Sequence, residues 1–216
     1  MSGNDSNKLF YNTVPLDVFQ SLTQQGGFNE CLDLQLIEKH LPVSASIMEV
    51  GAGYGRCVDF LLSKKHEAPI LAIEQSPQLS KVLLEKYKNQ SIVQVINDDI
   101  KTLVVSEQVD VVLWMFSGML DFAKEEQPKV LKRLRLFLKN DGKLFLDVPQ
   151  LAELTVAKYT SKQDIVMETA YGNITTFLPA WADIEDYASQ AGFSKVSVIH
   201  YNTTTEKKRS IFMLEA

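Results

Sequence analysis

Short apolar runs alternate along the chain with longer segments that place apolar residues at helical spacing. Continuously apolar runs are typical of parallel strands that are buried on both faces of a sheet. The runs expected to form such strands are residues 47–50, 70–74, 92–96, 109–116 and 143–148. The segments expected to form helices around them are residues 15–25, 29–41, 55–65, 76–87 and 124–139. Strands that alternate with helices predict an α/β fold built on a parallel sheet.

The alternation changes toward both ends of the chain. Residues 1–8 are polar and are expected to form a disordered or loosely held start. The turn Asn140-Asp141-Gly142 is expected to end the helix before the fifth strand. The later elements expected from the pattern are a helix over 151–159, short strands over 164–171 and 174–178, a helix capped by Asp183, and strands over 195–201 and 210–214.

The first strand runs directly into a glycine-rich turn. Gly51, Gly53 and Gly55 occupy every second position, and residues 57–62 follow with helical spacing. Gly51 suits the positive φ of a tight turn, and Gly53 and Gly55 lack a Cβ, which would leave room for a ligand against the backbone. The free N–H groups of the following helix favour a carboxylate, a phosphate or a ribose. These features predict a ligand cradle, although such a turn also serves as a plain connection.

Two further acidic positions follow the ends of predicted strands. Glu74 lies nineteen residues after Gly55, the spacing at which dinucleotide-type folds place an acid on ribose hydroxyls. A carboxylate accepts from two vicinal hydroxyls at once. The alternative for Glu74 is an exposed acid at a strand end. Asp98 and Asp99, followed by Ile100, end the third strand, and the alternative for one of these acids is to cap the helix that follows.

These blocks together resemble the class I S-adenosylmethionine-dependent methyltransferases. The Gly-x-Gly-x-Gly loop, with Glu49 two positions before its first glycine, resembles motif I of that family, whereas a nicotinamide dinucleotide site has Gly-x-Gly-x-x-Gly. The resemblance extends from about residue 46 to the C-terminus. It implies an α/β three-layer sandwich with a mostly parallel seven-stranded sheet and a C-terminal antiparallel hairpin, whose last strand lies between the fifth and sixth. The implied organisation is an N-terminal helical segment or lid (1–45) and a methyltransferase domain (46–216) with a substrate-side insert (150–180).

The resemblance implies that S-adenosylmethionine lies across the carboxyl ends of the strands. Glu49 would help to hold its amino group, Glu74 its ribose, and Asp99, in the register favoured over Asp98, its adenine. Tyr11 would belong to a lid over the cofactor, or it anchors the N-terminal segment to the core. The residues expected to bind the cofactor are Tyr11, Glu49, Gly51, Ala52, Gly53, Gly55, Arg56, Glu74, Gln75, Asp98, Asp99, Ile100, Trp114, Met115 and Phe116.

The sequence is less informative about the acceptor of the methyl group. Several amine- and base-methylating families carry Asn/Asp-Pro-Pro-Tyr after the fourth strand, and this chain has Trp114-Met115-Phe116-Ser117 instead. Core packing is an equally good interpretation of Trp114 and Phe116. No catalytic residue is assigned, and the candidate bases are Asp147, Tyr171, His200 and Tyr201. The insert over 150–180 is interpreted either as part of the acceptor pocket or as a surface elaboration.

Composition narrows the function further. The chain has 216 residues, which fits one domain, and its formal net charge of −5 gives no support for nucleic-acid binding. Cys31 and Cys57 are too few for a disulfide framework and lack metal-ligand spacing, so no metal site and a reducing, cytoplasmic setting are expected. The polar start lacks the apolar core of a secretory signal, and no apolar run is long enough for a membrane span.

The expected function is methyl transfer from S-adenosylmethionine to a small-molecule acceptor, without nucleic-acid or membrane partners. Two alternatives stay open. One is a non-catalytic protein that binds S-adenosylmethionine or S-adenosylhomocysteine and acts through a partner. The other is a methyltransferase of protein or RNA, which the absence of a basic extension disfavours. A dehydrogenase is opposed by the glycine spacing, and the sequence predicts no oligomeric state.

Overall fold

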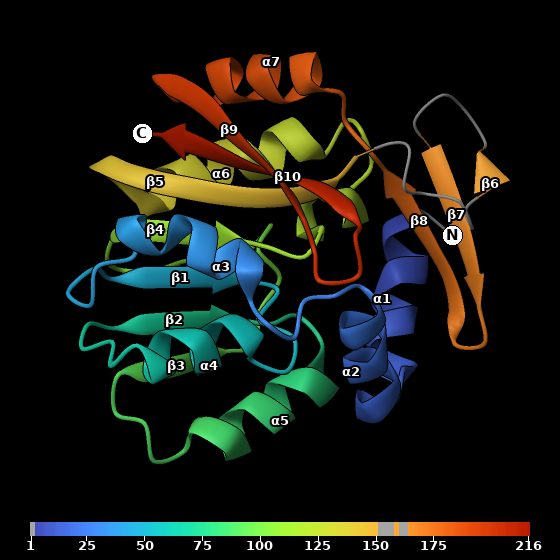
Figure 1. Ribbon diagram of the computed structural model, residues 1–216, viewed down its shortest axis with the longest axis horizontal. Coiled ribbons are helices and arrows are strands. Elements are labelled where there is room, and N and C mark those ends of the chain that lie inside the picture. The colour runs from blue at the N-terminus through green and yellow to red at the C-terminus, as the bar shows by residue number, and fades with distance from the viewer. Residues whose placement is uncertain (1–2, 151–157, 160–163) are drawn as a thin grey trace.

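A seven-stranded sheet forms the centre of the computed structural model, which describes residues 3–150, 158–159 and 164–216 (Figure 1). Its strand order is β3-β2-β1-β4-β5-β10-β9. The strands are β1 (Ile47–Val50), β2 (Ile70–Ile73), β3 (Val93–Ile96), β4 (Val109–Trp114), β5 (Leu138–Pro149), β9 (Lys195–Asn202) and β10 (Lys208–Glu215). Strands β1 to β5 pair in parallel, and β10 pairs antiparallel with both β5 and β9. The expected sheet, with its last strand inserted beside the fifth, is therefore confirmed.

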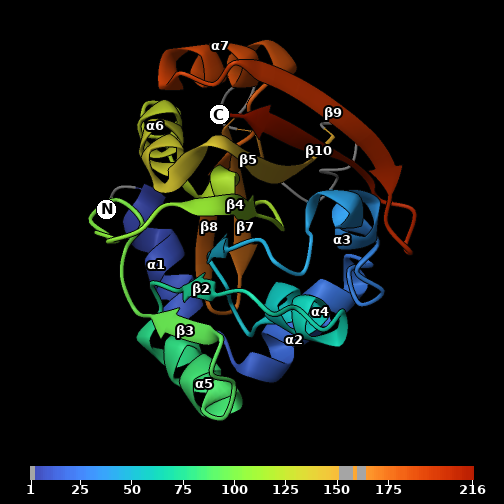
Figure 2. The ribbon, with the colours of Figure 1, turned by 90° about the vertical axis from the view of Figure 1, so that its left-hand side faces the viewer.

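Helices cover both faces of this sheet, as the edge-on view shows (Figure 2). The side chains of α6 (Gln127–Phe137) and α7 (Trp181–Ala191) share one core with one face of the central strands. Those of α3 (Leu32–Ile37), α4 (Arg56–Ser63) and α5 (Pro77–Tyr87) share a second core with the opposite face. Along β1, Met48 and Val50 belong to the first core and Ile47 to the second, as the period of two in a strand requires. The three-layer sandwich is confirmed.

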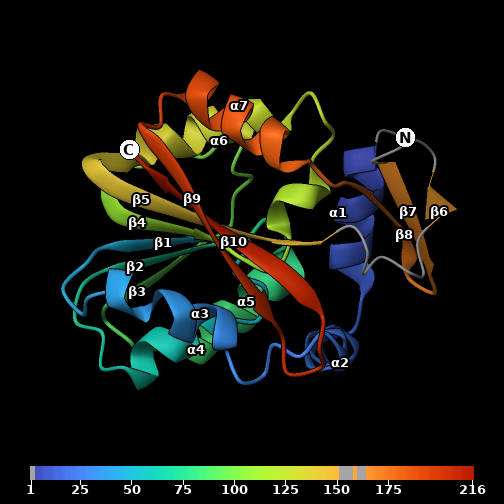
Figure 3. The same ribbon diagram turned by 45° about the horizontal axis from the view of Figure 1, so that its top comes forward.

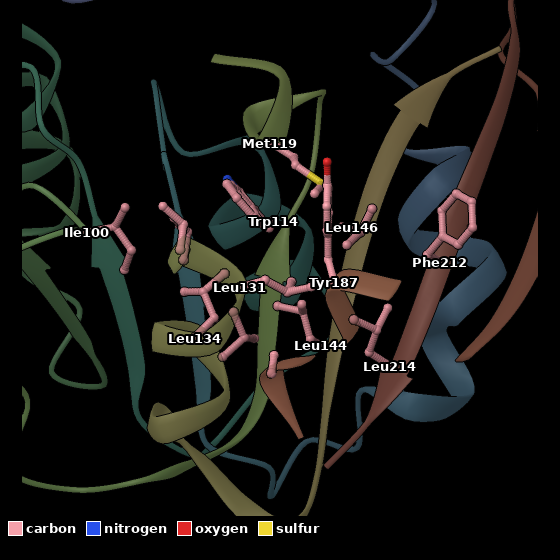
Figure 4. Packing of buried hydrophobic residues seen from close by; sticks show 14 of the residues in the cluster. Ile100, Trp114, Met119, Leu131, Leu134, Leu144, Leu146, Tyr187, Phe212 and Leu214 are labelled. Carbon is pink, nitrogen blue, oxygen red and sulfur yellow. The ribbon is translucent and has the colours of Figure 1, made fainter. Parts of the chain in front are cut away.

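The first core is packed around Trp114 (Figure 4). Leu131 and Leu134 of α6 and Leu144 and Leu146 of β5 are fully buried beside it. Each such side chain contributes about 1.5–3 kcal/mol by leaving water. The core holds the central strands in a fixed position, so the loops at their carboxyl ends start from a rigid edge.

The N-terminal segment forms two helices at that edge, α1 (Gly3–Thr13) and α2 (Leu16–Gln25). A second sheet of β6 (Lys158–Tyr159), β7 (Asp164–Thr169) and β8 (Gly172–Phe177) packs against α1 on its far side (Figure 3). The Asn7 side chain joins them, because it accepts a hydrogen bond from the Thr175 N–H and donates one to the Thr175 carbonyl, both at 2.8 Å. The β7–β8 hairpin was expected. Of the helix expected over 151–159, residues 151–157 lie outside the described residues, and Lys158–Tyr159 form β6 instead.

Several expectations about element boundaries were wrong. Residues 3–8 belong to α1 instead of a loosely held start, because Asn7 and Lys8 bond to distant parts of the chain. Helix α6 ends at Phe137, and Asn140-Asp141-Gly142 lies inside β5 instead of forming the stop. Helix α7 begins at Trp181, and the Asp183 carboxylate accepts from the Ala180 N–H within its first turn. The remaining short helices are η1 (Glu38–His40) and η2 (Gly118–Asp121).

Candidate functional site

The glycine loop after β1 is tied to the end of β2. The N–H groups of Gly51 and Ala52 both donate to the Ile73 carbonyl at 2.9 Å. The N–H of Gly53 donates to Glu74 Oε2 at 2.8 Å, and the Ser76 N–H donates to Oε1 at 2.7 Å. Burial raises the pKa of Glu74, and these backbone hydrogen bonds oppose the increase. The glycine loop and the acid predicted nineteen residues later therefore meet at one edge of the sheet.

The three glycines of the loop serve different purposes. All three have positive φ, at 71°, 58° and 90° for Gly51, Gly53 and Gly55. A Cβ at Gly51 would meet nothing within 4 Å, whereas one at Gly53 would lie 3.1 Å from the Phe19 ring. A Cβ at Gly55 would overlap the Tyr87 hydroxyl, which donates to the Gly55 carbonyl at 2.8 Å. The expectation that Gly55 leaves room for a ligand needs correction, because Tyr87 occupies that space and the open side of the loop is at Gly51.

Glu49 is a buried carboxyl group with an unsatisfied oxygen. Its side chain points into the core of the α4 face, only 4% of the residue is exposed, and Oε2 has no hydrogen-bond partner. The nearby Arg56 donates to both Asp33 oxygens, at 2.8 and 2.6 Å, so Asp33 takes up its positive charge. Burial raises the pKa of Glu49 to about 7. A buried oxygen without a partner lowers the stability of the folded protein unless a hydrogen-bond donor or a cation binds to it. The amino group of a ligand would supply such a donor.

A small cavity of about 40 Å³ lies over the loop. It is lined by Phe19, Thr23, Glu49, Val50, Gly51, Ala52, Gly53, Tyr54, Arg56, Cys57, Met115 and Phe116. Small-molecule sites usually measure about 300–1,000 Å³, so this cavity alone is too small for a nucleoside. The N-terminal helices lie over the rest of the predicted site. Ser76 Oγ donates to the Tyr11 carbonyl at 3.0 Å, and Lys8 Nζ pairs with Asp99 Oδ2 at 2.8 Å.

The predicted adenine residues have separate roles in the turn after β3. Asp98 Oδ1 accepts from the Asp99 N–H at 2.7 Å and from Thr102 Oγ1 at 3.1 Å, so Asp98 caps the turn. Burial favours a higher pKa for Asp99, but the hydrogen bonds from Lys8 and Lys101 outweigh it and lower that pKa. Ile100 is buried in the first core. Of Asp98 and Asp99, only Asp99 thus forms an ion pair among the described residues, and its partner is Lys8.

The other predicted site residues divide between the core and the cavity. Trp114 is buried in the first core, in agreement with the packing alternative. Met115 and Phe116 line the small cavity, and Phe116 has a φ of 52°, so the chain turns sharply after β4. The carbonyl of Gln75 accepts from the Asn97 amide at 3.2 Å, which holds it beside the end of β3.

A second cavity of about 260 Å³ lies on the other side of two aromatic rings. Phe19 and Phe116, whose ring centroids are 6.5 Å apart, line both cavities. The remaining lining residues are Phe10, Tyr11, Leu22, Ser117, Leu120, Asp121, Pro149, Met167, Ile174, Thr176, Lys207, Lys208 and Arg209. The walls come from α1, α2, η2, the β7–β8 hairpin and β10, so the 150–180 segment contributes to this cavity.

Asp121 is an acid in this cavity that the sequence analysis missed. Its Oδ1 accepts from the Asn7 amide at 3.3 Å and from the Tyr11 hydroxyl at 3.4 Å. Burial raises the pKa of Asp121 to about 7. The available signal was an acidic residue shortly after the fourth strand, at the edge where ligands bind in open α/β sheets.

The structure gives other roles to the candidate bases. Asp147 is fully buried and binds Arg209 through both of its oxygens, and the Tyr201 hydroxyl donates to Asp147 Oδ1 at 2.8 Å. His200 packs against Trp181 and its Nδ1 lies 2.9 Å from Ser210 Oγ. Tyr171 lies at the tip of the β7–β8 hairpin. None of these four side chains lines either of the two cavities described above.

The described part of the chain has neither a cluster of metal ligands nor a helix that could span a membrane. No group of three or more His, Cys, Asp or Glu side chains there is arranged to hold a metal ion. Among the described helices, none is both long and apolar enough to cross a membrane.

Comparison with known proteins agrees with the geometry of the loop. Residues 47–142 match a family model described as a methyltransferase domain. No curated protein sequence matches the chain.

Solved structures extend the likeness to most of the chain. The CcbJ methyltransferase from Streptomyces caelestis has a TM-score of 0.70 at 14% identity, over 97% of this chain and 99% of that one. An S-adenosylmethionine-dependent methyltransferase from Clostridium acetobutylicum has a TM-score of 0.69 at 12% identity, over 92% and 96%. A 1,6-didemethyltoxoflavin-N1-methyltransferase from Burkholderia thailandensis, bound to 1,6-didemethyltoxoflavin and S-adenosylhomocysteine, has a TM-score of 0.67 at 14% identity, over 92% and 82%.

These structural likenesses show the fold, and the family model adds the methyltransferase domain that contains the glycine loop, Glu49 and Glu74. Of the solved structures named above, one is described as S-adenosylmethionine-dependent and another holds S-adenosylhomocysteine. Residues 47–142 are therefore similar to a methyltransferase domain, and the fold of the chain is that of solved methyltransferases.

Proposed function

We propose that the chain transfers the methyl group of S-adenosylmethionine to a small molecule held in the cavity of about 260 Å³. The observation that supports this proposal is the pair of cavities separated by Phe19 and Phe116. One cavity contains the glycine loop and Glu49, and the other is largely apolar and close to the lower end of the size range for small-molecule sites.

The residues of the smaller cavity fit the methionine part of the cofactor. Glu49 Oε2 lacks a partner and would accept from the ammonium group, while the open side of Gly51 leaves space for the chain that carries it. Each Glu74 oxygen accepts one backbone N–H and keeps a further lone pair for a ribose hydroxyl. S-adenosylmethionine supplies a methyl group that is already activated on a sulfonium sulfur.

The N-terminal helices would have to release Asp99 before adenine reaches it. The Lys8 and Asp99 side chains are 40% and 20% exposed, and an ion pair of that kind contributes about 0–1 kcal/mol. Breaking the Lys8–Asp99 ion pair would therefore subtract only a small amount from the free energy of nucleoside binding. The same helices, through Tyr11 and Phe19, would afterwards help to exclude water and to align donor and acceptor, and such alignment supplies up to ~7–11 kcal/mol.

Likeness to solved structures guides the choice of acceptors. One structural neighbour acts on 1,6-didemethyltoxoflavin, and another is the glycopeptide N-methyltransferase MtfA, with a TM-score of 0.67 at 13% identity over 88% of this chain and 89% of that one. For this chain, the size of the cavity and its largely apolar lining favour the smaller kind of acceptor.

We expect the purified protein to convert S-adenosylmethionine to S-adenosylhomocysteine in the presence of some members of a panel of phenols, catechols and amines of one or two rings. Mass spectrometry of the acceptor and of S-adenosylhomocysteine measures the transfer. Leu22→Trp, which fills the cavity wall, should lower transfer, whereas Leu136→Trp, on the exposed surface of α6, should not. Binding of S-adenosylmethionine without transfer to small molecules, and with transfer to protein or RNA, would contradict the proposal.

A further inference from the structure

Asp121 is held at one oxygen and leaves the other available. Its Oδ1 accepts from Asn7 and Tyr11, and Asn7 also donates to the backbone carbonyl of Asp121 at 3.2 Å. Asn7 is itself fixed to Thr175 of β8 by two hydrogen bonds. Within the described ranges, no hydrogen bond reaches Asp121 Oδ2. The carboxyl group therefore has a fixed orientation and a free acceptor atom in a residue that lines the larger cavity.

No ion pair among the described residues includes Asp121. The titratable groups that act on it are Tyr11 from α1, which lowers its pKa by donating a hydrogen bond, and Glu74, directly after β2, whose negative charge raises it. Burial is the larger effect and brings the pKa to about 7. A base of this pKa works best near neutral pH.

Cations from β10 and from the residue directly before it also line this cavity. They are Lys207, Lys208 and Arg209, and Arg209 is paired with Asp147. The two lysines are exposed at the rim. None of the three is within ion-pair distance of Asp121 in the described structure, so Asp121 keeps its basicity.

We propose that Asp121 is the catalytic base that removes the proton from the attacking atom of the acceptor. The inference rests on the proposed function and deepens it, because it defines the acceptor class as small molecules with an ionisable hydroxyl or ammonium nucleophile on an apolar body. The position after β4 supports this role, since Phe116, which lines both cavities, is only five residues before Asp121.

The step balances without a further reactant. The proton of the acceptor O–H or N–H passes to Asp121 Oδ2, a lone pair of the oxygen or nitrogen forms the bond to the methyl carbon, and the electron pair of the broken carbon–sulfur bond stays on sulfur. For a hydroxyl acceptor, the charges of the sulfonium and the carboxylate cancel. The products are the methylated acceptor, S-adenosylhomocysteine and protonated Asp121. For an ammonium acceptor, its extra positive charge remains on the product.

The first test needs no known acceptor. In protein labelled with ¹³C at the aspartate carboxyl carbon, one resonance should titrate with a midpoint near 7, disappear in Asp121→Asn and persist in the exposed acid-to-amide control Glu125→Gln. Tyr11→Phe removes a donor to the charged form, so the midpoint should move to higher pH. A midpoint for Asp121 near the ordinary value of about 3.9 would overturn the proposal.

The second test uses acceptors found in the panel. Asp121→Asn should lower kcat by about 10²–10⁴-fold and leave the Kd for S-adenosylmethionine unchanged, Asp121→Glu should recover part of the loss, and Glu125→Gln should match the wild type. The wild-type kcat should rise with pH through about 7, and Asp121→Asn should lose this rise. Unchanged kcat in Asp121→Asn, or transfer confined to acceptors without an ionisable proton, would overturn the assignment while the methyltransferase function stands. Failure of the wild type to bind S-adenosylmethionine would instead reject the proposed function, and the carboxyl titration would still test Asp121.

Discussion

Replacing Asp147 by alanine is expected to lower the free energy of unfolding by about 3–5 kcal/mol. Asp147 is fully buried at the end of β5, and Arg209, on the adjacent strand β10, is only 7% exposed. Arg209 Nε lies 3.0 and 3.1 Å from the two Asp147 oxygens, and its Nη2 lies 2.6 Å from Oδ2. Without the carboxylate, the guanidinium would be a buried charge with no counter-ion, and the Tyr201 hydroxyl would lose its acceptor.

Urea unfolding at neutral pH measures this loss. The Lys195–Glu215 pair is a suitable control, because its side chains are 63% and 30% exposed, and Lys195→Ala should change the free energy of unfolding by at most about 1 kcal/mol. The double variant Asp147→Leu/Arg209→Met removes both charges and should recover most of the stability. A loss below 1 kcal/mol for Asp147→Ala would show that this buried pair does not stabilise the junction of β5 and β10.

Replacing Glu49 by glutamine is expected to stabilise the free protein at pH 8 and to weaken the binding of S-adenosylmethionine. The folded-state pKa of about 7 lies above the ordinary 4.5. Between these values the unfolded chain releases the Glu49 proton and the folded chain keeps it, so stability falls as pH rises. The difference of about 2.5 units corresponds to about 3 kcal/mol at pH 8, which Glu49→Gln would recover as an upper limit.

The binding change has the opposite sign because the cofactor carries an ammonium group. A hydrogen bond between charged groups contributes about 1.5–3 kcal/mol, so its loss should weaken binding about 10- to 100-fold. Thermal unfolding at pH 4 and pH 8 together with calorimetry measures both effects, and the exposed Glu67→Gln is the matched control. If Glu49→Gln bound S-adenosylmethionine as tightly as the wild type, the assignment of the methionine end to Glu49 would be wrong.

The central strands of the sheet could be predicted from the sequence because β1 and β4 are buried on both faces. The largely apolar run 109–116 predicted a strand, which the structure forms over Val109–Trp114, and the place of the last strand followed from the family resemblance. The first helix could not be predicted, because α1 depends on long-range contacts instead of its own pattern. Asn7 bonds to β8 and Lys8 to Asp99, more than 90 positions away in each case.

The candidate site was predictable where a motif has a fixed spacing. The loop with Gly51, together with Glu49 and Glu74, follows from such spacing. The space around each glycine could not be predicted from that spacing, because it depends on Phe19 and Tyr87, which belong to other helices. Asp121 ends the short helix η2 and its surroundings come from α1 and β8, so its position shortly after the fourth strand is the one signal that the local sequence offers.

Titration of the purified protein with S-adenosylmethionine and S-adenosylhomocysteine by calorimetry tests the central claim most directly. The wild type and Glu67→Gln should bind both compounds. Glu74→Gln should bind them much more weakly while circular dichroism shows an intact fold, because the carboxylate that accepts from the ribose hydroxyls is lost. A wild-type protein that is folded but binds neither compound would contradict the placement of the cofactor on the glycine loop.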